Sequence, residues 1–159
     1  MTRVLIVGFG NPLRSDDGVG WHAAQRLSGE LLCANVQVVT RQQLTPEIAD
    51  FVSRAERVLF VDAASSGKPG TLLCRKVVPA DPHDSYSHEL SPATVLNLAE
   101  KLYGRCPPAF LFTVAGENFE TGDAMSPAVC SAFPILLERI RQFMDGSEDA
   151  VGVVDIETG

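Results

Sequence analysis

The fold is decided by the stretch RVLIVGFGNPL at residues 3–13. Residues 3–8 form an almost unbroken apolar run that ends in glycine, which is typical of a strand buried on both faces of an α/β sheet. A loop rich in Gly, Asn and Pro follows. Residues 18–32 then carry an apolar side chain at every fourth position from Val19 to Leu31, as one face of a helix does. This order predicts the first strand–loop–helix unit of an α/β protein.

The rest of the chain continues the alternation of strands and helices. Further strands are expected at residues 36–40, 58–61, 71–78 and 110–115, and further helices at 46–53 (capped by Thr45), at 92–103 and from 127 to about 145. Only about eight residues join the third and fourth strands, whereas a parallel crossover needs a dozen or more. The fourth strand is therefore predicted to run antiparallel, in a mixed five-stranded sheet with helices on both faces.

Length and composition indicate one globular domain. The chain has 159 residues, of which 45% are hydrophobic and 21% charged, and a chain of this size buries an adequate core. We expect the domain to span residues 1–145 and an acidic tail to follow at 146–159. The net charge of −7 argues against nucleic acid or an anionic membrane as the main partner, because both require a basic surface.

The sequence carries no sign of export or of membrane insertion. No apolar run approaches the roughly 20 residues of a membrane-spanning helix, and no signal peptide is expected. The four cysteines include no CxxC pair, so structural zinc and a disulfide framework are not expected. Cys74 lies in the middle of an expected strand, which favours packing over catalysis. These features predict a cytoplasmic protein with reduced thiols.

Candidate chemistry gathers at one edge of the predicted sheet. Asp16 and Asp17 follow the first strand, Asp62 ends the third, and a polar loop before the helix at 92–103 carries His83 and His88. Ligands of open α/β sheets bind at the carboxyl ends of the parallel strands. Two carboxylates and an imidazole at that edge suit a divalent transition metal such as nickel, zinc or manganese.

Each of these residues also has a structural interpretation. An aspartate before a helix is usually its N-cap, which applies to Asp16. Asp62 could hydrogen-bond its own turn, and His88 could be a solvated loop residue. Gly8 and Gly10 suggest a nucleotide-binding module, but the G-x-G-x-x-G pattern fails because Leu13 stands where the third glycine belongs.

A longer motif favours one function. Residues 8–20, GFGNPLRSDDGVG, closely resemble the N-terminal signature of the [NiFe]-hydrogenase maturation endopeptidases. The similarity continues in order at residues 61–63 with 69–71, at 87–92 and at 116–127. Enzymes of this family remove a C-terminal extension from the hydrogenase large subunit after nickel insertion. The resemblance implies a three-layer α/β/α sandwich of the phosphorylase/hydrolase-like kind, with one antiparallel strand in its five-stranded sheet.

The resemblance also implies site residues. Asp17, Asp62 and His88 match the family's catalytic and nickel-binding positions, where the acid equivalent to Asp17 is often Glu. Either Asp16 or Asp17 therefore remains a candidate to reach the metal. We assign substrate contacts to Gly10, Asn11 and Asp16, because backbone N–H groups of such glycine-rich turns often receive ligands at helix starts.

The function expected from this resemblance is an aspartate- and nickel-dependent endopeptidase. Its partner is the large-subunit precursor, which also supplies the nickel, and no organic cofactor is implied. We expect a monomer. The alternative is a non-catalytic metal-binding maturation chaperone that uses the same ligands. The chain departs from many family members after the second strand, where residues 40–46 replace an Asp-Gly-Gly-Thr type turn.

Overall fold

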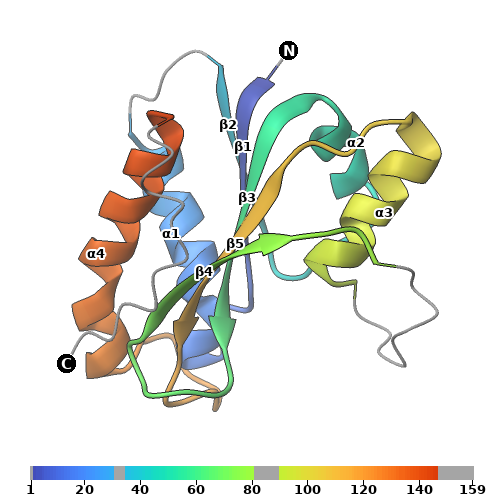
Figure 1. Ribbon diagram of the computed structural model, residues 1–159. Helices are drawn as coiled ribbons and strands as arrows, with labels where there is room; N and C mark the ends of the chain where they lie inside the picture. Colours follow the sequence, from blue (N-terminus) through green and yellow to red (C-terminus); the bar gives the residue numbers. More distant parts are fainter. Residues whose placement is uncertain (1, 31–34, 81–89, 147–159) are drawn as a thin grey trace.

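The computed structural model describes residues 2–30, 35–80 and 90–146, and these residues form three layers. Its strands are β1 (Thr2–Phe9), β2 (Val36–Arg41), β3 (Ala55–Ala64), β4 (Leu72–Val77) and β5 (Ala109–Ala115). Its helices are α1 (Val19–Ser28), α2 (Ile48–Ser53), α3 (Pro92–Tyr103) and α4 (Pro127–Met144), with a short 3-10 turn (Ser15–Gly18) before α1. The sheet lies between α1 and α4 on one face and α2 and α3 on the other (Figure 1).

The sheet confirms the predicted topology. Its five strands are ordered β2-β1-β3-β5-β4, and β4 is antiparallel to β5 while the other neighbours are parallel. Gly8, near the end of β1, pairs with Thr40 of β2 and with Val61 of β3. The loops after these three strands therefore leave the sheet at the same edge. The chain moves from β1 outward to β2 and then back past β1 to β3, and such a switch is where α/β sheets bind ligands.

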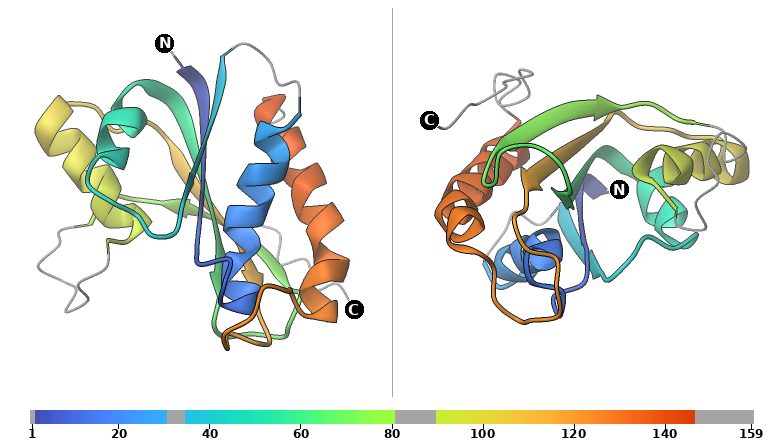
Figure 2. Two further views of the ribbon diagram at one scale, coloured as in Figure 1. Left: turned by 180° about the vertical axis from the view of Figure 1, so that it is seen from behind. Right: turned by 90° about the horizontal axis from the view of Figure 1, so that it is seen from below.

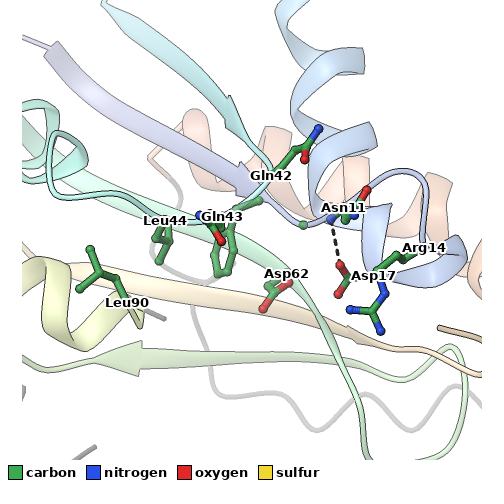
Figure 3. A pocket seen from close by; sticks show the side chains of 10 residues that line it. Asn11, Arg14, Asp17, Gln42, Gln43, Leu44, Asp62 and Leu90 are labelled. Carbon is green, nitrogen blue, oxygen red and sulfur yellow. Dashed lines mark hydrogen bonds between the residues drawn. The ribbon is translucent and has the colours of Figure 1, made fainter. Parts of the chain in front are cut away.

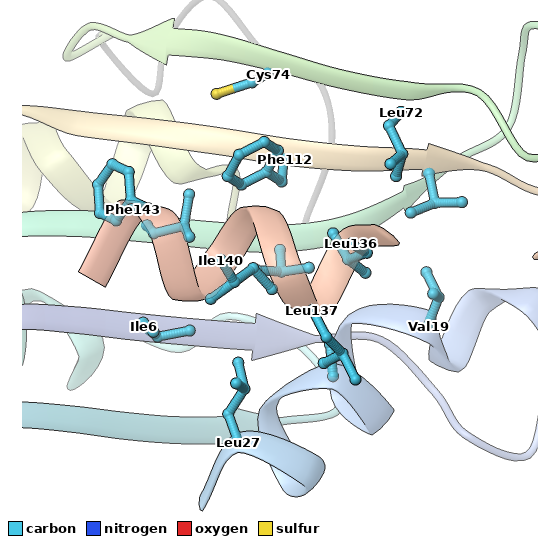
Figure 4. Packing of buried hydrophobic residues seen from close by; sticks show 14 of the residues in the cluster. Ile6, Val19, Leu27, Leu72, Cys74, Phe112, Leu136, Leu137, Ile140 and Phe143 are labelled. Carbon is cyan, nitrogen blue, oxygen red and sulfur yellow. The ribbon is translucent and has the colours of Figure 1, made fainter. Parts of the chain in front are cut away.

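The apolar run of β1 divides between two cores, as a strand buried on both faces requires. Val4 and Ile6 pack against α1 and α4, whereas Leu5 and Val7 pack against α2 and α3. Figure 4 shows the first of these clusters, and the view from below in Figure 2 shows the sheet between the two helix pairs. No helix in the described part of the chain is both long and apolar enough to cross a membrane.

Helix ends follow the local sequence in α3 but not in α2. Ser91 Oγ accepts a hydrogen bond from the Thr94 N–H, and Gly104 ends α3 with a φ of 73°. Thr45 was expected to cap the helix at 46–53, but this is wrong: the N-cap is Glu47 and α2 begins at Ile48. The chain first makes a tight turn there, with bonds from N–H groups to carbonyls three residues back. Helix α1 ends at Ser28, whereas the helix was expected to continue to residue 32, and residues 31–34 lie outside the described part.

Helix α1 contacts the sheet backbone to backbone through two glycines. A Cβ on Gly20 would lie 2.1 Å from the Val61 carbonyl oxygen, and one on Gly8 would lie 2.1 Å from the Gly20 carbonyl oxygen. Real side chains do not approach this closely. Glycine at both positions lets α1 lie against β1 and β3, which brings the start of the helix to the sheet edge.

We predict that Gly20→Ala destabilises the protein. The added methyl must displace α1 from β3, and such overpacking costs about 1–3 kcal/mol or more. Gly29→Ala is the matched control, because its backbone is helical and its Cβ would have 3.5 Å of room. Urea unfolding of both variants measures the effect, and equal midpoints would contradict the described contact.

Candidate active site

A pocket of about 400 Å³ opens at the sheet edge where β1, β2 and β3 end (Figure 3). Its walls come from the ends of β1 and β3, from the segments after β1 and β2, and from Leu90 just before α3. The described residues that line it are Phe9, Gly10, Asn11, Arg14, Asp17, Gln42, Gln43, Leu44, Asp62 and Leu90. The pocket thus has both an apolar wall and a strongly polar one, and the polar wall includes two of the predicted catalytic carboxylates.

Asp17 is held in place by the loop after β1. Its Oδ2 accepts a hydrogen bond of 2.9 Å from the backbone N–H of Asn11. The Asn11 side chain in turn accepts a 2.9 Å bond from the Leu13 N–H, which closes a tight turn. Asp17 is half-buried. Its carboxylate is therefore oriented by the backbone and still faces the pocket.

Asp62 reaches the same pocket from β3. Its Oδ1 accepts a 2.8 Å bond from the N–H of Ala63, the next residue of β3, while Asp62 also lines the pocket. Gly10 is close to both acids. A Cβ added to Gly10 would lie 2.0 Å from the Asp17 carbonyl oxygen and 3.8 Å from Asp62 Oδ1. Gly10 also has a φ of 139°, which favours glycine.

Asp16 does not contact the pocket, and this corrects two expectations. It is fully buried, so it is not exposed to a substrate, and it makes no capping bond to α1. Its Oδ2 accepts bonds from the N–H groups of Glu117 and Asn118 and from the Ser126 hydroxyl, at 2.8, 3.0 and 2.8 Å. Its Oδ1 accepts a 2.7 Å bond from the Ser126 N–H. Asp16 therefore joins the first loop to the segment between β5 and α4.

These bonds change the acidity of Asp16. Burial raises the pKa of its carboxyl, but the hydrogen bonds from Asn118, Glu117 and Ser126 outweigh burial and leave the pKa below its usual value of 3.8. Backbone bonds extend the same junction: Ser15 N–H donates to the Gly122 carbonyl and Gly122 N–H donates to the Leu13 carbonyl, at 2.8 and 2.9 Å. The loop that holds Asp17 is thereby anchored.

The backbone N–H groups of this loop are already in use. Every non-proline residue from 10 to 17, all within the described part of the chain, donates its N–H to an acceptor in the protein. The expectation that this loop offers N–H groups to a substrate is therefore wrong. Gly10 and Asn11 line the pocket, so a substrate contact through other atoms of these two residues stays a prediction.

Three of the remaining candidate residues have different outcomes. His83 and His88 lie outside the described residues. Cys74 is confirmed as a packing residue: it is buried in the core beside α4, and burial raises the pKa of its thiol to about 11.

The described residues supply only part of a metal site. Asp17 and Asp62 provide carboxylate oxygens to the pocket, but no group of three or more His, Cys, Asp or Glu side chains suitable for a metal occurs among residues 2–30, 35–80 and 90–146. Two carboxylates fit a divalent cation as partial ligands.

Comparisons with known proteins give matches in structure. No protein-family model matches the sequence, and no curated protein sequence matches it. The hydrogenase maturating endopeptidase HybD from E. coli is 22% identical, with 92% of this chain and 94% of that chain covered and a TM-score of 0.74. The [NiFe] hydrogenase maturation protease HycI from Thermococcus kodakarensis is 20% identical, with 91% and 93% covered and a TM-score of 0.75.

A third solved structure agrees. It is the hydrogenase 2 maturation peptidase from a Thaumarchaeota archaeon, which is 22% identical, with 91% of this chain and 99% of that chain covered and a TM-score of 0.69. The chain has the fold of the hydrogenase maturation endopeptidases. The fold that the sequence resemblance implies is thus confirmed over nearly the whole length of both chains.

Within this maturation-endopeptidase fold, the pocket also contains residues that the sequence did not single out. Arg14 lies inside the signature motif, and Gln42, Gln43 and Leu44 follow β2. The position of residues 42–44 at the end of a parallel strand was a usable signal, because the loops after β1, β2 and β3 share one edge. Nothing in the local sequence indicated that Arg14 lines the pocket.

We predict that Asp16→Asn destabilises the protein by roughly 1–3 kcal/mol, because an amide group must face N–H donors that the carboxylate now satisfies. Asp17→Asn is the matched control and should change stability little, since its remaining oxygen still accepts the Asn11 N–H. Urea unfolding at neutral pH measures both. Similar losses in the two variants would contradict the structural role of Asp16.

We also predict a pH dependence that belongs to Asp16. Its pKa in the folded protein lies below the 3.8 of the unfolded chain, so the unfolded state binds more protons between these values. The stabilisation is fully present above the unfolded pKa and is lost as pH falls through the folded one. Unfolding free energies between about pH 2 and 5 should decline more steeply for the wild type than for Asp16→Asn; parallel curves would contradict this.

Proposed function

We propose that this protein is an endopeptidase that removes the C-terminal extension of a [NiFe]-hydrogenase large-subunit precursor. The observation that carries the proposal is the convergence of Asp17 and Asp62 on one pocket at the switch between β1 and β3. Paired carboxylates in a cleft can take the roles of metal ligand and general base. The shared fold with endopeptidases of that name supports this assignment.

In this proposal nickel is part of the substrate. Asp17, Asp62 and His88 bind the nickel already seated in the precursor, and no organic cofactor takes part. His88 is included because it matches the family's histidine position in the sequence resemblance.

Binding the precursor's metal would fix the scissile peptide next to the two acids. Such positioning replaces a bimolecular encounter with an oriented reaction and supplies much of a rate enhancement. A carboxylate of the pocket or the nickel then activates a water molecule, which attacks the peptide carbonyl. The products are the mature large subunit and the released extension.

The two other hypotheses differ in what they require. A metal-binding chaperone would use the same ligands without shortening the precursor, so cleavage separates it from the endopeptidase. A nucleotide-binding module would need free N–H donors in the loop after β1 for phosphate. All N–H groups of residues 10–17 already donate within the protein, which disfavours that module. We further propose that the enzyme acts in the cytoplasm as a monomer, with neither nucleic acid nor membrane as a partner.

We predict that Asp17→Asn, Asp62→Asn and His88→Ala each abolish cleavage of the nickel-loaded precursor while the variants remain folded. Each change removes a ligand or base at a loop or strand end, where substitution should alter stability by about 0.5 kcal/mol or less. Gel mobility of the precursor measures cleavage, and circular dichroism melting measures folding.

Asp123→Asn is the control for lost negative charge, since Asp123 is exposed and absent from the described pocket lining. It should cleave at the wild-type rate. Normal cleavage by any of the three site variants would remove that residue from the proposed site. An intact precursor in the presence of the wild-type protein would favour the chaperone.

A further inference from the structure

Hydrolysis of a peptide bond places negative charge on the carbonyl oxygen, and a protein donor must receive it. In many enzymes this donor is a backbone N–H in a glycine-rich loop. The loop after β1 cannot supply such a donor, because each N–H group of residues 10–17 is already hydrogen-bonded within the protein. A donor supplied by this loop must therefore be a side chain.

Arg14 is the side chain best placed for this task. It is the only positively charged residue among the described residues that line the pocket, which it shares with Asp17 and Asp62 (Figure 3). Its side chain is exposed. Within the described part of the chain it forms no ion pair. The guanidinium thus lines the same pocket as two carboxylates, and its ion pairing is not used by any described residue.

The backbone of Arg14 is fixed although its side chain is not. Its N–H donates to the Asn11 carbonyl at 3.0 Å, and its own carbonyl accepts the Asp17 N–H at 3.1 Å. An isolated β-bridge also links Arg14 to Gly122. Arg14 is therefore held at a constant position relative to Asp17, as a group that assists a reaction at that carboxylate must be.

The other candidate donors in the pocket are weaker. Asn11, Gln42 and Gln43 carry neutral amides, whereas hydrogen bonds from a guanidinium are charge-assisted and roughly twice as strong. A developing oxyanion gains more from Arg14 than from any of these amides.

We propose that Arg14 is a catalytic residue that stabilises the oxyanion of the scissile peptide; this rests on the proposed function. Water oxygen forms a bond to the carbonyl carbon, its proton passes to a base in the pocket, and the carbonyl π electrons move to the oxygen that Arg14 binds. The tetrahedral intermediate then re-forms the carbonyl as the C–N bond breaks, and the proton goes to the leaving amine. The products are a carboxylate and an amine.

The test is single-turnover cleavage of nickel-loaded precursor by Arg14→Met over a range of enzyme concentrations. The maximal rate should fall about 10²- to 10³-fold, as on loss of an oxyanion donor, while the half-saturating concentration changes little. Guanidinium ions, below concentrations that unfold the protein, should restore part of the rate to Arg14→Met. Arg26→Met, on the exposed face of α1, is the control and should match the wild type.

The outcomes separate the inference from the function on which it rests. A wild-type protein that leaves the precursor intact overturns the proposed function. If the wild type cleaves and Arg14→Met reaches the same maximal rate, or recovers it as enzyme concentration rises, the oxyanion role is overturned while the endopeptidase remains. Melting midpoints of Arg14→Met and Arg14→Lys verify folding, and Arg14→Lys should keep part of the maximal rate because it keeps the positive charge.

Discussion

The buried carboxylate of Asp16 is the interaction on which the geometry of the pocket depends. Its two oxygens accept four hydrogen bonds from Glu117, Asn118 and Ser126. These donors belong to the segment between β5 and α4, whereas Asp16 belongs to the loop after β1. One side chain thus joins the beginning and the end of the domain at the edge where the pocket opens, and its neighbour Asp17 takes its orientation from the loop so fixed.

The two adjacent acids of this loop differ in their environment. Asp16 is fully buried and its bonding capacity is taken up inside the protein, while Asp17 receives one backbone bond and faces the pocket. The same loop uses all its backbone N–H groups to hold its own shape. In the proposed mechanism, substrate chemistry therefore falls to side chains, namely the carboxylates of Asp17 and Asp62 and the guanidinium of Arg14.

Local patterns in the sequence were sufficient for the fold. The short connection before β4 predicted its antiparallel direction, and Ser91 and Gly104 marked both ends of α3. The edge shared by Asp17 and Asp62 was predicted because both acids were expected at the carboxyl ends of parallel strands. The role of Asp16 could not be predicted in this way, because its partners lie 101 to 110 positions further along the chain. In the sequence, an aspartate that caps a helix cannot be distinguished from one that accepts hydrogen bonds from distant segments.

In the proposed mechanism, the nickel already seated in the precursor binds to the pocket and makes cleavage possible. The most direct test is cleavage of purified precursor by the wild-type protein, with nickel-loaded and nickel-free precursor compared at equal concentration. We expect that only the nickel-loaded precursor is shortened, and that a free peptide with the same cleavage sequence remains intact. Efficient cleavage of the nickel-free precursor or of the peptide would contradict it, because the pocket would then be catalytically complete without the substrate's metal.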